Sequence, residues 1–77
     1  RSLKRDEEVQ TLEDVICLVF LEFYLEDFAG KHEEAKLIDI IRKTWNKMSP
    51  TGHAAALTLP LNDKMLTLVG KALSPDN

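Results

Sequence analysis

The 77-residue chain has a single cysteine, Cys17, so it cannot form an internal disulfide. Cys17 lies in the longest unbroken apolar run, residues 15–21, and we expect it to be a small buried core side chain. That run is far shorter than the roughly 20 residues that a membrane-spanning helix needs, and no secretory signal is present. We therefore expect a cytoplasmic protein without a membrane partner.

The sequence also lacks a strong charge imbalance and the common motifs of catalytic sites. A net charge of −3 gives no electrostatic reason to expect a nucleic-acid partner. There is no glycine-rich phosphate loop, no GxSxG and no CxxC, and His32 and His53 do not have zinc-binding spacing. We expect surface or capping roles for both histidines.

The size and the start of the chain favour a piece of a larger unit. At 77 residues, with 44% apolar and 30% charged residues, it has the composition of a small soluble domain. It lacks an initiating Met and opens on charged residues. We interpret residues 1–77 as a single helical domain or the C-terminal fragment of a larger one, with residues 74–77 as a polar tail.

The pattern predicts an all-α bundle of about four helices and no strand. The first is predicted over residues 11–30, where Thr11-x-x-Asp14 matches a capping box and Gly30 ends the helix through the left-handed conformation. Residues 4–10 could add an earlier turn to this helix.

The second helix, over residues 32–48, has the clearest periodicity. Its apolar stripe follows the i, i+3, i+4, i+7 rule and consists of Leu37, Ile38, Ile41, Thr44, Trp45 and Met48.

Two shorter helices follow. Ser49 as N-cap and Pro50 as first residue predict a third helix that ends near residue 57. Pro60 breaks the chain, and a fourth helix is expected from Asn62 or Asp63 to residue 73. Its expected apolar side is Leu66, Val69 and Leu73.

The first helix is apolar on almost every side, because only Glu22 is polar between residues 15 and 25. Such a helix belongs at the centre of a structure. The three other helices cannot surround it, so we expect its partner to be a missing N-terminal portion of the same protein or a second copy.

Asp14 is the strongest candidate functional residue. An ionised carboxylate beside a buried helix needs amides, a cation or a metal as partner. The capping box and a metal site both meet that need, and both remain open. Eight residues, about 12 Å along the axis, separate Asp14 from Glu22, so they do not form one two-carboxylate site. We expect Glu22 and Glu26 to mark the least buried edge of the helix.

Basic residues form a modest stripe on the second helix. Lys36, Lys43 and Lys47 project within about 40° of one another, with Arg42 further round. The row includes Asp39, and a solvated face is the favoured interpretation. Arg42, Lys43 and Lys47 are the candidate phosphate contacts.

Three stretches carry a family resemblance: "LKRDEEVQ", "TLEDVICLVFLEFY" and "AKLIDIIRKTWNKMSPTGHAAAL". Together they resemble the C-terminal part of the domain of unknown function 4202 family, which is sometimes labelled glutamyl-tRNA synthetase. The resemblance implies an all-helical relative of the HD phosphohydrolases, in which an H…HD…D set holds divalent metals that activate water.

Asp14 matches the last Asp of that set, while the first His and the His-Asp pair have no counterpart here. The resemblance thus implies that the complete protein is a Mn²⁺- or Mg²⁺-dependent hydrolase of phosphomonoesters or nucleotides, and that this chain alone is inactive. The alternative is a non-catalytic helical module that binds a protein partner, with Asp14 as a cap.

Overall fold

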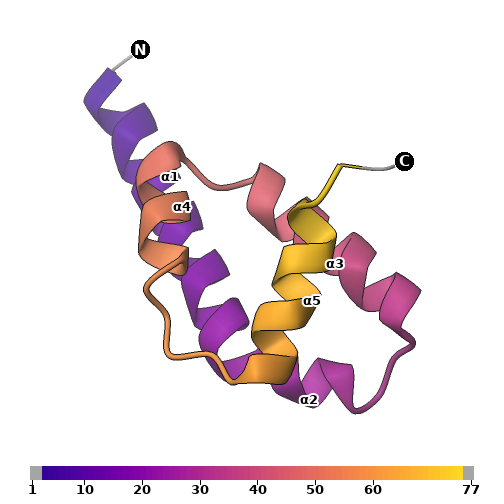
Figure 1. The fold of residues 1–77 in the computed structure, drawn as a ribbon. Coiled ribbons are helices and arrows are strands. Elements are labelled where there is room, and N and C mark those ends of the chain that lie inside the picture. Colours follow the sequence, from indigo (N-terminus) through magenta and orange to yellow (C-terminus); the bar gives the residue numbers. More distant parts are fainter. Residues whose placement is uncertain (1–2, 76–77) are drawn as a thin grey trace.

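The computed structural model describes residues 3–75, which form helices and no strand (Figure 1). The first helix is continuous through α1 (Leu3–Val19), a π-helical turn (Phe20–Tyr24) and α2 (Leu25–Ala29). Counting these three as one, the described part of the chain has the four predicted helices. The prediction of an all-α fold is confirmed.

The start of the first helix corrects one prediction. Because α1 begins at Leu3, residues 4–10 belong to it and Asp14 lies in its interior. The capping box of Thr11 and Asp14 is therefore wrong: a helix interior has no orphan amides for these side chains to accept from.

A π-helical turn separates α1 from α2 and keeps the buried side aligned. The amide of Leu25 donates to the carbonyl of Phe20, the i to i+5 bond that takes in one extra residue. Cys17, Leu21 and Leu25 are each 5% exposed or less, although their four-residue spacing would drift around a regular α-helix. No sequence pattern predicted this turn.

The end of the first helix also differs in detail from the prediction. Gly30 is its C-cap, as expected, but its φ of −75° is right-handed. The expected left-handed closure is wrong, because the amide of Gly30 continues to donate to the preceding turn.

The second predicted helix is α3 (Glu34–Asn46), slightly shorter than expected at both ends. Its stripe is confirmed: Leu37, Ile41 and Met48 are buried, and the other members are half-buried.

The third and fourth helices are α4 (Pro50–Ala56) and α5 (Asp63–Leu73). Ser49 and Asn62 are their N-caps, each accepting from an amide of the first turn. The predicted apolar side of α5 is wrong, because Leu66 is 51% exposed. The buried side is offset by one residue and consists of Met65, Leu68 and Ala72.

Two helix pairs build the molecule. α3 packs against α5, and α4 packs against α1, while α2 turns the chain from one pair to the other (Figure 1). The core collects buried side chains from the first helix, α3, α4 and α5. The first helix therefore lies at one side of the molecule rather than at its centre. No described helix is long and apolar enough to cross a membrane. Of the predicted polar tail, residues 76–77 lie outside the described part.

Candidate functional site: the Asp14 junction and the exposed face of the first helix

Asp14 joins α1 to the start of α4. Its Oδ1 accepts from the amide of Ser49 at 2.9 Å and from Gln10 Nε2 at 2.9 Å. Its Oδ2 accepts from the Ser49 hydroxyl. Gln10 Nε2 also donates to the carbonyl of Lys47 at 3.0 Å, at the end of α3. The carboxylate, which is 9% exposed, thus joins α1 to α4, and Gln10 links it to the end of α3.

The same junction requires glycine at position 52. A Cβ built on Gly52 would lie 2.7 Å from Asp14 Cγ and 2.8 Å from Asp14 Oδ1. The amide of Gly52 donates to Ser49 Oγ at 3.1 Å. Ser49 Oγ therefore accepts from α4 and donates to Asp14, and any side chain at position 52 would push the carboxylate away.

The electrostatics of the junction favour ionised Asp14. The hydroxyl of Ser49, and then its amide, lower the pKa of Asp14 below 3.8 by hydrogen bonding to the charged form, against an opposing effect of burial. Asp14 thus secures a helix start, as the capping interpretation required, but the helix is α4 and not its own. In the sequence, Ser49-Pro50 indicates the start of α4, but no pattern pairs Ser49 with Asp14.

Asp14 also borders a pocket of about 500 Å³ between α1 and α4. Glu7 lines the same pocket, but no three His, Cys, Asp or Glu side chains among residues 3–75 gather as metal ligands. The donors present near Asp14 thus do not make a metal site by themselves. Its carboxylate oxygens are already occupied by Ser49 and Gln10.

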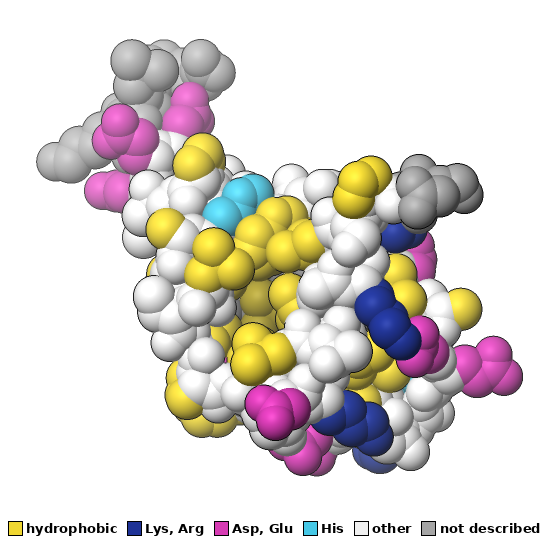
Figure 2. Space-filling model, viewed as in Figure 1, with side chains coloured by type: hydrophobic (Ala, Val, Ile, Leu, Met, Phe, Trp, Pro, Cys, Tyr) yellow, Lys and Arg dark blue, Asp and Glu magenta, His cyan; other side chains and the backbone are white. Residues whose placement is uncertain are grey.

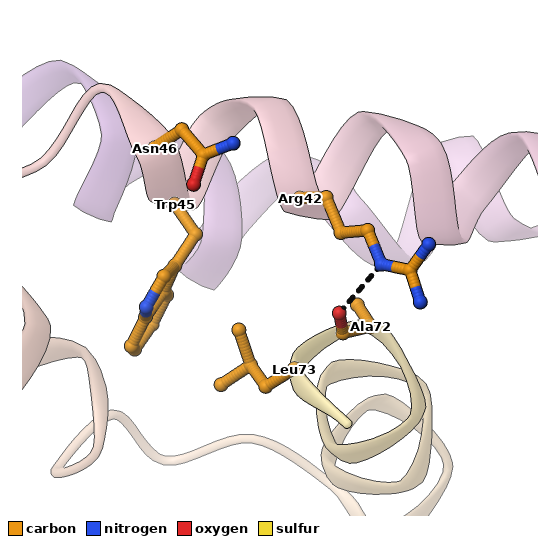
Figure 3. Close-up of a pocket in the computed structure, with 5 residues that line it drawn as sticks. All are labelled: Arg42, Trp45, Asn46, Ala72 and Leu73. Carbon is orange, nitrogen blue, oxygen red and sulfur yellow. Dashed lines mark hydrogen bonds between the residues drawn. The ribbon is translucent and has the colours of Figure 1, made fainter. Parts of the chain in front are cut away.

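The three candidate phosphate contacts are not gathered into one pocket. Arg42 lines a pocket of about 340 Å³ with Trp45, Asn46, Ala72 and Leu73 (Figure 3). Its Nε donates to the carbonyl of Ala72 at 2.8 Å, which ties α3 to the end of α5. Lys43 lies outside this lining and pairs with Asp39 at 3.1 Å, and Lys47 is exposed at the end of α3.

Two further residues are structural. Cys17 is buried, as predicted, and its burial raises the pKa of the thiol. His53 stacks on Trp45 with ring centroids 4.2 Å apart, and its Nε2 lies 2.8 Å from the Trp45 carbonyl. His53 thus helps to hold α4 against the end of α3.

The outer side of the first helix carries an exposed apolar stripe. Its members are Val9 (62% exposed), Leu12 (60%), Ile16 (56%), Val19 (40%) and Phe23 (64%). We call these five residues the exposed stripe. Glu22 is half-buried, so the expectation that it marks the least buried edge is wrong.

Spacing distinguishes this stripe from scattered surface residues. Its members follow one another at intervals of three, four, three and four residues, the heptad pattern by which one helix packs against another. The spacing was visible in the sequence. Because the whole helix is apolar there, only the structure shows which side the neighbouring helices leave open.

A second apolar area lies between α4 and α5, away from the exposed stripe (Figure 2). Figure 2 shows apolar side chains gathered in a hollow between α4 and α5, with a histidine at its edge.

These features define the class of protein. Residues 3–75 form an all-α protein with a fastened helix junction, an exposed helix face and no assembled metal-ligand group. The chain belongs to the family described as Domain of unknown function (DUF4202), which matches residues 1–69. The family resemblance is thereby confirmed, and the match carries no hydrolase or synthetase description. No curated protein and no solved structure matches the chain.

Proposed function

We propose that this chain is a non-catalytic helical interaction module whose contact surface is the exposed stripe of the first helix. The observation that carries the proposal is the exposure of five large apolar side chains at heptad spacing. Contiguous apolar patches on a stable surface mark sites of association. A heptad stripe suits a helical partner, whose side chains can interdigitate with it.

The junction at Asp14 supports this function from the other side of the helix. Asp14 and Gln10 fix α1 against α3 and α4. Because these contacts restrain α1 before a partner arrives, less conformational entropy is lost on binding. The stripe is therefore presented on an ordered helix.

The test uses a synthetic 21-residue amphipathic helix with Ile and Leu along one face and Gln on both flanks. We expect this peptide to bind the chain and to lose at least tenfold in affinity against Leu12→Gln/Ile16→Gln, measured by calorimetry. Both positions are exposed, so the double variant should keep its stability within roughly 0.5 kcal/mol per site.

The matched control is Leu57→Gln/Leu66→Gln, which removes two comparably exposed leucines, one at the C-cap of α4 and one in α5. It should bind the peptide like the wild type. No binding to the wild type, or an equal loss in both double variants, would overturn the proposal.

A metal-assisted phosphohydrolase is the second candidate. It is supported by the ionised carboxylate of Asp14, which shares a pocket with Glu7. The remaining ligands to Mn²⁺ or Mg²⁺ would have to come from a longer protein that contains this chain, with Arg42, Lys43 and Lys47 as candidate phosphate contacts. In that protein Asp14→Asn should fold but lose bound metal. Metal content equal to the wild type, measured by atomic emission, would contradict the metal role.

A further inference from the structure

We infer that the partner of the exposed stripe is an amphipathic helix flanked by Lys and Arg, rather than a second copy of this chain. This inference rests on the proposed function and adds the chemistry of the occupant. It depends on the charges beside the stripe.

Over most of the first helix, every charged residue is acidic. Residues 6–30 contain no Lys, Arg or His. They contain eight acidic residues: Asp6, Glu7, Glu8, Glu13, Asp14, Glu22, Glu26 and Asp27. Figure 2 shows acidic side chains gathered at the N-terminal end of α1. Asp14 is buried in the junction, and the other seven acids give the first helix a negative surface for a docking helix to meet.

Acidic side chains lie along both edges of the stripe. With Val9 and Ile16 at heptad position a and Leu12 at d, Glu8 falls at position g and Glu13 at e. These are the positions whose charges set partner choice in paired helices. A partner with basic residues at its own e and g positions would neutralise both edges.

A second copy of the chain would place acidic residues opposite acidic residues. In a parallel pair, Glu8 of one copy would face Glu13 of the other. In an antiparallel pair, e faces e and g faces g, so acidic residues again meet acidic residues. The apolar spacing would allow such a pair, but its flanking charges repel in both orientations. Self-association through this face is therefore disfavoured relative to a basic helix.

The experiment compares three 21-residue peptides with the same Ile and Leu face and with Lys, Gln or Glu at all flanking positions. We expect the Lys peptide to bind at least about tenfold more tightly than the Glu peptide at low salt. The difference should shrink as salt is raised, because the Debye length falls from about 10 Å at 0.1 M to about 3 Å at 1 M.

Two double variants, each of which removes two negative charges, test whether the preference for the Lys peptide depends on the acids beside the stripe. Glu8→Gln/Glu13→Gln should reduce the preference for the Lys peptide. Glu33→Gln/Asp39→Asn, which alters exposed acids on α3, should leave that preference closer to the wild type. An equal reduction in both would mean that net charge, and not the edges of the stripe, selects the partner, and the inference would be wrong.

The outcomes separate this inference from the function on which it rests. If the Gln peptide binds and the Lys and Glu peptides bind equally, the docking function stands and the basic partner is wrong. If sedimentation shows a dimer that Leu12→Gln/Ile16→Gln abolishes, the occupant is a second copy. If none of the peptides binds and no dimer forms, both the function and the inference are wrong.

Discussion

Replacing Gly52 by Ala tests the packing of the Asp14 junction with a matched control in the same chain. Both Gly52 in α4 and Gly70 in α5 lie in helices, where Ala is more favourable than Gly by about 0.5–1 kcal/mol. A Cβ on Gly70 meets nothing within 4 Å, so Gly70→Ala should raise the free energy of unfolding by that amount.

Gly52→Ala gains the same helix preference but places its Cβ 2.7 Å from Asp14 Cγ. The Asp14 carboxylate cannot move away from this Cβ without lengthening its hydrogen bonds to Ser49. Overpacking of this kind costs about 1–3 kcal/mol. Because both variants gain the same helix preference, the free energy of unfolding of Gly52→Ala should be lower than that of Gly70→Ala by this overpacking cost. For a chain of this size the two melting temperatures should differ by roughly 4–8 °C for each 1 kcal/mol.

Thermal and urea unfolding followed by circular dichroism measure both variants. Equal stabilisation by Gly52→Ala and Gly70→Ala would contradict the close packing of Gly52 against Asp14. In that case Asp14 would not be held against α4, and its role as the fastening between helices would fail.

Three further predictions concern individual contacts of the fold. Ser49→Ala removes the N-cap of α4 and should lower the free energy of unfolding by about 0.5–2 kcal/mol in urea titration; an unchanged value would contradict the cap. Because the pKa of Asp14 is lowered by folding, its contribution is complete above its ordinary value of 3.8 and is lost as the pH falls through the lower folded value. Asp14→Asn should therefore show a shallower loss of melting temperature at acidic pH than the wild type, and equal slopes would contradict this. Arg42→Met should cost about 1–2 kcal/mol through the lost bond to Ala72, whereas Lys43→Met at the exposed pair with Asp39 should stay within about 0.5 kcal/mol; equal costs in urea titration would mean that the Arg42 bond adds no stability.

The helices and the N-cap of α4 were predictable from the sequence. The stripe of α3 follows one periodicity, and Ser49-Pro50 marks a helix start by local chemistry alone. These signals depend on neighbouring residues, so no knowledge of the tertiary structure is needed to interpret them.

The face of α5 could not be chosen in the same way. Met65, Leu68 and Ala72 have the same spacing as Leu66, Val69 and Leu73, which each lie one residue later in the chain. Packing against α3 decides between the two sides, and that contact joins segments far apart in the chain.

The role of Asp14 was predictable only in part. Its buried charge required a partner, but that partner, Ser49, is 35 residues away. The capping box offered a local answer that the longer α1 excludes. The spacing of the exposed stripe could be recognised in the sequence. Its exposure could not, because it depends on where α3 and α4 pack against the first helix.

The most direct test of the docking surface is to map the bound Lys-flanked peptide by nuclear magnetic resonance on the isotope-labelled chain. We predict that the largest changes in amide chemical shift fall within residues 8–24, along the exposed stripe. Changes confined to residues 55–73, around the hollow between α4 and α5, would contradict the claim that the first helix is the contact surface.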